Sequence, residues 1–416
     1  MGISPMMCSA TGLWLWGDFT FEKPAEIVAA SFLSAIFLGI VLLCYRFGFR
    51  RRWLQKELLR GAYVTDSRLF FGLWFSLGMA ILVFWGLGIE GTFFRTSFDG
   101  FLSAGPVTTF VQTFIRPMPL FIGVPMFWIL LADRFGIGSP RVWLAGMSVS
   151  VGLLINFPLS VARFYALMVV NIFFYFIMFS PKLIRASWIG GSLLLVGFMS
   201  SFIIDAARFA KTAAEMSSRV TNAAESLNAS SFYVGHVDAF ELLVYGIEYV
   251  EDYGYTDGRQ LTGALFFWVP RSVWNDKPIP TGAYLGSSYI NIMSATKNTN
   301  LSAPIVLEGY LDGGWFAALV LAGMLGVSLG IGDNALLARR AEVANLGKTR
   351  ICRIDCLAAP LLGLVLFFLR GPLLSTFAFT TSISLAGLFV WEVFFKEYRG
   401  VGKNGRNNYA FSRKSL

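Results

Sequence analysis

Long apolar runs without charged residues recur along the whole chain. A helix needs roughly 20 predominantly apolar residues to cross a lipid bilayer. The runs that approach or reach this length are Ile27–Tyr45, Leu69–Ile89, Pro117–Ala132, Val142–Ala162, Phe164–Pro181, Ala186–Ile204, Gly313–Gly332, Cys356–Leu369 and Gly371–Trp391. They predict an all-α fold, a polytopic transmembrane helical bundle of about nine or ten spans.

Some of these runs have uncertain ends. The third is expected to start near Val107 and to carry Arg116 inside it, and the eighth to begin near Arg353. The uncharged opening segment Met1–Gly17 lacks the basic region of a signal peptide and contains three Gly and one Pro, so we expect an interfacial or re-entrant piece. If it spans instead, the bundle has ten helices and both chain ends are cytoplasmic.

Lysine and arginine gather in alternate connections between the runs. These connections are 46–68, 133–141, 182–185, 338–353 and the tail after Trp391. The positive-inside bias assigns them, with the C-terminus, to the cytoplasm. They also explain the net charge of +9 without nucleic acid. The chain is 56% hydrophobic and 14% charged, more apolar than a soluble domain requires.

One long polar segment falls on the opposite, extracytoplasmic side. The expected division is an N-terminal transmembrane bundle (1–205), an extracytoplasmic loop carrying much of the functional site (206–312), C-terminal transmembrane helices (313–395) and a basic cytoplasmic tail (396–416). Within the loop, apolar residues at helical spacing predict amphipathic helices on the membrane surface or capping the bundle, while 274–302 is predicted to be an ordered loop. The spaced residues lie in Ala206–Leu227 and at Phe240, Leu243, Val244, Ile247 and Val250.

Several cations converge on the extracytoplasmic side in this topology. Arg116, Arg163 and Arg370 lie within apolar runs or at their ends, and the loop adds Arg208, Arg259, Arg271 and Lys277. Charge inside a membrane usually faces the bundle interior or a watery cavity, and arginine offers a fixed fork for phosphate oxygens. An anion site is therefore expected. The alternative is that individual side chains pair with carboxylates or reach the lipid headgroups.

Three titratable groups of the loop are candidates for proton transfer. The chain contains one histidine, His236, and Asp238 follows it, while Glu308 stands just before the chain re-enters the membrane. A group-transfer reaction needs a base near neutral pH. His236 can equally be an ordinary loop histidine, and one histidine does not indicate zinc. Cys352 and Cys356 are expected to be structural.

Aromatic side chains crowd the second half of the loop. Trp268, Trp274 and Tyr310 are candidates for stacking on sugar rings, and Tyr284 and Tyr289 lie among them. The alternative is an interfacial position at the membrane surface.

Three motifs of this chain resemble one protein family. They are TDGRQLTGALFFWVPRSVWNDKPIPTGAYLG at 256–286, NFPLSVARF at 156–164 and LEGYLDGGWFAAL at 307–319. Together they are similar to the Wzy-type polysaccharide polymerases, also called oligosaccharide repeat unit or O-antigen polymerases. The Pro-Arg-Ser, Trp and Lys-Pro of 270–278 are the most specific part, and the resemblance spans roughly Val142 to Leu325.

The resemblance implies a glycosyltransferase at the outer face of the bacterial inner membrane. A glycan carried on undecaprenyl diphosphate would be moved to the next undecaprenyl-diphosphate-linked repeat unit, with no cofactor and no metal. A chain-length regulator and a flippase are possible partners. Fixed donors for the diphosphate would come from Arg163, Arg208, Arg271 and Lys277, with Arg259 and Arg116 nearby in the topology. Glu308 is the first choice for the base, and Asp238 or His236 the second.

Other classes of membrane protein remain as alternatives. An O-antigen ligase uses the same lipid donor, although the sequence PRSVWNDKP favours a polymerase. A flippase or secondary transporter should have internal repeats and short loops, which the long polar loop disfavours. A structural membrane protein would leave the cations of the outer side unexplained.

Overall fold

The computed structural model describes most of the predicted spans and more than half of the polar loop. The described residues are 24–51, 55–59, 61–62, 65–93, 108, 110–132, 139–157, 160–178, 215, 217–219, 221–222, 239–288, 301–346 and 351–395. The predicted span Ala186–Ile204, the segment Met1–Gly17 and most of Ala206–Leu227 lie outside them.

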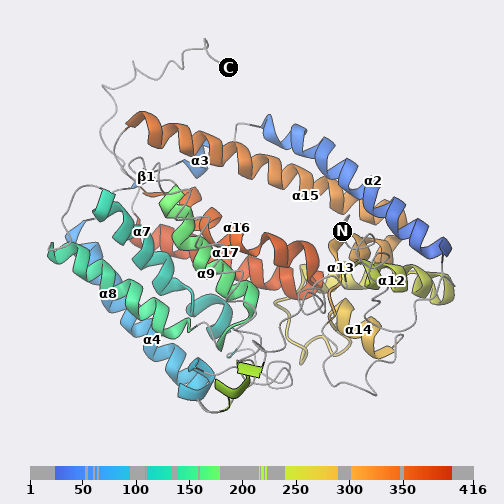
Figure 1. Cartoon of the computed structure of the whole chain (residues 1–416), viewed down its shortest axis with the longest axis horizontal. Helices are drawn as coiled ribbons and strands as arrows, with labels where there is room; N and C mark the ends of the chain where they lie inside the picture. Colours follow the sequence, from blue (N-terminus) through green and yellow to red (C-terminus); the bar gives the residue numbers. More distant parts are fainter. Residues whose placement is uncertain are drawn as a thin grey trace, which may run out of the picture.

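The described chain is almost entirely helical (Figure 1). Its elements are α2 (Pro24–Phe49), α3 (Gln55–Leu58), β1 (Gly61–Ala62), α4 (Asp66–Phe93), the π-helix η1 (Val111–Ile115), α7 (Met118–Ala132), α8 (Pro140–Ile155), α9 (Arg163–Met178), α12 (Ala239–Tyr253), α13 (Arg259–Leu265), α14 (Thr281–Ser288), α15 (Ile305–Leu346), β2 (Ile351–Cys352), α16 (Arg353–Arg370) and α17 (Leu373–Phe394). Five helical segments within these ranges are long and apolar enough to cross a membrane: Pro24–Phe49, Asp66–Phe93, Val111–Leu131, Ile305–Val343 and Leu373–Phe394. The prediction of an all-α membrane protein is confirmed at this level.

Two predicted boundaries are wrong. Helix α8 ends at Ile155 rather than Ala162, because the Asn156 side chain turns back to Gly152 O (2.7 Å) and Pro158 follows in the sequence. Helix α15 begins at Ile305, eight residues before the expected start at Gly313. Its axis breaks at Gly313 and at Gly314, where φ is 61° and ψ is −149°, a backbone conformation that favours glycine. Part of 274–302, predicted as loop, forms α14.

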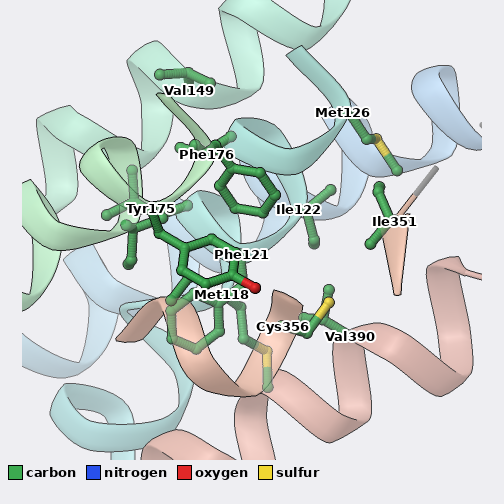
Figure 2. Packing of buried hydrophobic residues seen from close by; sticks show 14 of the residues in the cluster. Met118, Phe121, Ile122, Met126, Val149, Tyr175, Phe176, Ile351, Cys356 and Val390 are labelled. Carbon is green, nitrogen blue, oxygen red and sulfur yellow. The ribbon is translucent and has the colours of Figure 1, made fainter. Parts of the chain in front are cut away.

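Two large hydrophobic cores organise the described part of the molecule. The larger lies among α4, α7, α8, α9, α16 and α17, where Phe121, Tyr175 and Phe176 pack together (Figure 2). The second joins α2, α12, α13, α14 and α15 to Leu373 at the start of α17. Outer-loop residues and membrane helices thus share one core, so the position of the loop is tied to the bundle.

Helices α2 and α15 form a close parallel pair along one edge of the molecule (Figure 1). A Cβ atom added at Gly330 would lie 2.2 Å from Tyr45 O, and one at Gly326 would lie 2.3 Å from Val41 O. A Cβ atom added at Gly48 would likewise lie 2.3 Å from Val327 O. Small residues let helix backbones approach in lipid, where van der Waals packing drives association. The close approach at these glycines therefore fixes how α2 packs against α15.

The helix ends predicted to be cytoplasmic meet in a buried polar cluster. Arg339 near the end of α15 contacts Asp355 of α16, with Nη2 2.9 Å from Oδ2, and the Tyr175 hydroxyl donates to Asp355 Oδ1 at 2.7 Å. The strands β1 and β2 pair antiparallel beside it, with Gly61 opposite Cys352. This cluster joins the connections at one end of the bundle. The opposite end, predicted to be extracytoplasmic, is called the outer end below.

Candidate functional site

Helix α12 lies over the outer ends of α2 and α15. Its five predicted apolar positions, Phe240, Leu243, Val244, Ile247 and Val250, are all buried. The helix comes close enough to α15 that a Cβ added at Gly246 would lie 2.2 Å from Leu307 Cδ1. The amphipathic pattern thus packs against membrane helices and forms one wall of the outer assembly, which consists of α12, α13, α14 and the first two turns of α15.

Asp312 holds the turn that leads into α13. Its carboxylate accepts hydrogen bonds from Gln260 N (3.1 Å), from Leu261 N (2.5 Å) and from the Thr256 hydroxyl. A carboxylate at the first backbone N–H groups of a helix satisfies donors that lack a partner within the helix. Asp257 lies in this turn with φ 50°, in the left-handed region. The last residues before the kink of α15 therefore position the loop that follows α12.

Arg271 and Lys277 fix the shape of the loop after α13. The Arg271 guanidinium donates to Lys277 O (2.6 Å) and Pro278 O (3.0 Å), and the Lys277 ammonium donates to Phe267 O (2.6 Å) and Val269 O (2.9 Å). Burial lowers the pKa of the Lys277 ammonium, and the positive charge of Arg271 adds to this effect. Each side chain thus uses two of its N–H donors for backbone carbonyl groups. These contacts give both side chains a structural role in the loop, and the binding of a diphosphate by them stays a prediction.

A cleft of about 610 Å³ opens between α12, the turn before α13 and this loop. Tyrosine rings, two carboxylates, two amides and two cations border it. The lining residues are Tyr249, Tyr255, Thr256, Asp257, Arg259, Gln260, Asn275, Asp276, Lys277, Pro278, Ile279 and Tyr284. The volume is within the range of about 300–1,000 Å³ typical of small-molecule sites, which places the candidate site here.

Tyrosines and one arginine give the cleft its fixed polar groups. The hydroxyl groups of Tyr249 and Tyr284 are 2.7 Å apart, and burial together with this hydrogen bond raises the pKa of Tyr249 to about 12. Arg259 donates through Nη2 to Asp276 O at 3.1 Å and is otherwise exposed. Of the cations predicted to bind the diphosphate, Arg259 and Lys277 line the cleft.

Glu308 does not line the cleft. Its side chain is only 1% exposed, its Oε2 accepts from the Thr281 hydroxyl (2.6 Å), and its Oε1 accepts from Leu373 N (2.8 Å). It thereby joins the starts of α14 and α17 to α15. These contacts give Glu308 a structural role, and its predicted role as the base stays a prediction.

Arg116 is also occupied by structural contacts. It is 3% exposed, and its guanidinium donates to Ile155 O (2.6 Å), Thr92 O (3.1 Å) and the Ser160 hydroxyl (2.5 Å). These groups belong to the outer ends of α4 and α8 and to the NFPLSVARF motif. An intramembrane charge is tolerated when such partners surround it. Arg116 therefore ties helix ends together, away from the cleft.

The other predicted site residues are divided between positions inside and outside the described part. Arg163 begins α9, but its side chain is not among the parts that the structure describes. Arg208, His236 and Asp238 also lie outside the described residues. The aromatic predictions do not coincide with the cleft: Trp268 is 68% exposed, Trp274 is half-buried, and neither lines it.

Tyr310 likewise lies outside the cleft, but it supports one of its walls. It is buried, with ring centroids 6.1 Å from Tyr255 and 6.4 Å from Trp315. The cleft instead uses Tyr249, Tyr255 and Tyr284, of which the sequence argument noted only the last.

Several residues that build the cleft were missed by the sequence argument. Asp312, Gln260, Asp257 and Asp276 were not singled out, since an exposed loop contains many such residues. Gly258 with φ 78° signals a turn before a short helix, but the carboxylate that caps this helix belongs to Asp312, 52 residues after Gln260. No local pattern could have identified that partner.

The fold and the outer assembly define an all-α membrane protein with a polar cleft at one end of its apolar helices. Searches of protein-family models, curated proteins and solved structures found no match for this chain. The similarity to Wzy-type polymerases consequently depends on the three motifs alone.

Proposed function

We propose that this chain is a membrane glycosyltransferase of the Wzy type, which extends a glycan on undecaprenyl diphosphate at the outer face of the bacterial inner membrane. One observation carries the proposal. Ten of the twelve residues that line the cleft belong to 256–286, the motif most similar to that family. The motif's most specific part, 270–278, contains Arg271 and Lys277, whose hydrogen bonds shape the wall of the cleft.

The proposed reaction forms one bond and breaks one. The acceptor sugar's hydroxyl oxygen attacks the anomeric carbon of the donor glycan, and the bond from that carbon to the diphosphate oxygen breaks. Undecaprenyl diphosphate leaves with the electron pair, and the hydroxyl proton passes to a protein base. The leaving diphosphate needs cationic donors, and the transition state resembles that of glycoside cleavage.

The contacts in the outer assembly redistribute the predicted roles. Arg116, Arg271 and Lys277 already donate to protein groups, so we propose Arg163 and Arg208 as the cations that hold the diphosphate. Glu308 is buried and does not line the cleft, so we propose Asp238 or His236 as the base and Glu308 as a positioning residue. The polyprenyl chain would remain in lipid beside the apolar helices.

Chain extension by the purified protein tests this proposal. Protein in lipid nanodiscs is mixed with undecaprenyl-diphosphate-linked repeat units, and the product length is read on a gel. We expect a ladder of lengths from the wild type, and Asp238→Asn or His236→Ala to shorten the products if that group is the base. Arg208→Lys should fail because lysine lacks the guanidinium fork. Arg219→Lys is the matched control, because Arg219 is exposed and pairs with Glu215 at 2.6 Å.

Two other products would contradict the polymerase. Transfer of the glycan to a lipid A core without extension of the lipid-linked unit would indicate an O-antigen ligase. Movement of the unmodified lipid-linked unit across a vesicle membrane, with no new glycosidic bond, would indicate a flippase.

A further inference from the structure

One residue that lines the cleft, Gln260, has a buried side-chain acceptor with no hydrogen-bond donor among the described residues. Gln260 is 3% exposed, and its backbone N–H is bound by Asp312. Its side-chain oxygen Oε1 is buried and has no hydrogen-bond donor among the residues that the structure describes. Buried polar atoms are nearly always paired, and an unpaired one lowers the stability of the fold. An acceptor kept in this position at the edge of a cleft suits a ligand that brings a donor.

The charges of the cleft also distinguish between ligand classes. Its lining holds two carboxylates, Asp257 and Asp276, against two cations, Arg259 and Lys277, so the formal charges cancel. The Lys277 ammonium already donates to two backbone carbonyl groups. Phosphate oxygens are acceptors, and they favour clusters of free cationic donors over carboxylates. A diphosphate is therefore poorly matched to this cleft.

Sugar hydroxyl groups meet the same surface well. Each hydroxyl can donate to a carboxylate or an amide oxygen and accept from Arg259. Tyr255 is 48% exposed and lines the cleft beside Tyr249 and Tyr284, which offers aromatic faces to the apolar side of a sugar ring. The combination of acceptors, aromatic rings and balanced charge is that of a carbohydrate site.

We propose that this cleft binds the sugar residues of the lipid-linked substrate and not its diphosphate, with Gln260 Oε1 accepting a hydrogen bond from a sugar hydroxyl. The inference refines the proposed function and rests on it for the identity of the substrate. It also separates the substrate into two parts. The glycan lies in the cleft, and the diphosphate lies elsewhere at the outer end of the bundle.

Binding of soluble probes tests the inference without any catalysis. The probes are single repeat units released by hydrolysis from the polysaccharide of the producing cell, and inorganic pyrophosphate. Wild-type full-length protein in nanodiscs should bind the oligosaccharide by calorimetry, and excess pyrophosphate should not displace it. Gln260→Met removes the acceptor at nearly constant volume, so we expect binding to weaken about five- to tenfold. The unfolding temperature should stay equal or rise, because no unpaired polar atom is left.

Two further variants keep the test decisive. Gln112→Met makes the same change in η1, outside the cleft lining, and should bind the oligosaccharide like the wild type. Asp257→Asn covers the case in which Gln260→Met does not fold, because Asn also tolerates the positive φ of Asp257. It keeps the size of the exposed side chain and removes the charged acceptor, so it should also weaken oligosaccharide binding.

The outcomes separate this inference from the proposed function. Competition by pyrophosphate, or unchanged binding in both cleft variants, would overturn the carbohydrate assignment even if chain extension is observed. Weakened oligosaccharide binding in the cleft variants supports the assignment. If such a protein extends no lipid-linked chain, the polymerase proposal fails while the binding site stands.

Discussion

Replacement of Glu308 distinguishes a positioning carboxylate from a catalytic base. Its two oxygens accept hydrogen bonds of 2.6 Å from Thr281 and 2.8 Å from Leu373 N in a buried setting. A buried donor that loses its acceptor costs about 1–3 kcal/mol, so Glu308→Ala, which leaves two donors unpaired, should cost about 2–6 kcal/mol of folding free energy. Glu308→Gln can retain both contacts with its carbonyl oxygen toward Leu373 N and its amide toward the Thr281 oxygen, at a cost of about 2 kcal/mol.

The assay measures stability and chain extension on the same preparations. We expect Glu308→Gln to keep most of the extension rate with a modestly lower unfolding temperature, and Glu308→Ala to lose both together. Thr281→Val removes one of the two donors at nearly constant size and should fall between them. Combined with Glu308→Gln, it should not be additive, because both changes alter the contact between Glu308 and Thr281.

One result would refute this reasoning. If Glu308→Gln unfolds like the wild type but extends chains about 10²- to 10⁴-fold more slowly, the carboxylate acts as the base. The acceptor hydroxyl would then have to reach it through a conformation that opens the contact between α14 and α17.

Further predictions concern the helix pair, the buried arginine and the topology. Gly330→Leu should separate α2 from α15 and reduce the yield of folded protein in detergent, because its Cβ would lie 2.2 Å from a backbone oxygen, whereas Gly332→Leu meets nothing within 4 Å and should be tolerated; equal yields would contradict the packing argument. Arg116→Lys should lose at least one of three buried hydrogen bonds and destabilise the protein by about 1.5–3 kcal/mol in thermal unfolding, and an unchanged midpoint would show that the fork is not needed. Reporter fusions at Ser230 and Ser415 should report the extracytoplasmic and cytoplasmic sides respectively, and an extracytoplasmic signal at Ser415 would reverse the topology.

Hydropathy alone predicted the membrane class and the approximate positions of the long helices. Runs of apolar residues set the spans Pro24–Phe49, Asp66–Phe93 and Leu373–Phe394 to within a few residues, because crossing a bilayer imposes a minimum apolar length on a local stretch of chain. The buried face of α12 was readable for a similar reason. Helical spacing places Phe240 and Leu243 on one side whatever they pack against.

Tertiary structure decided what each polar residue does. The sequence placed Arg116, Arg271, Lys277 and Glu308 at the outer end of the bundle, but it could not show which backbone groups face them. Those partners lie in other segments: Arg116 reaches Ile155 O, and Glu308 meets the start of α17. A charged side chain binds ligand only with the donors or acceptors that the fold leaves unused. Contacts between distant parts of the chain decide which donors and acceptors stay unused. Local sequence patterns do not encode these contacts.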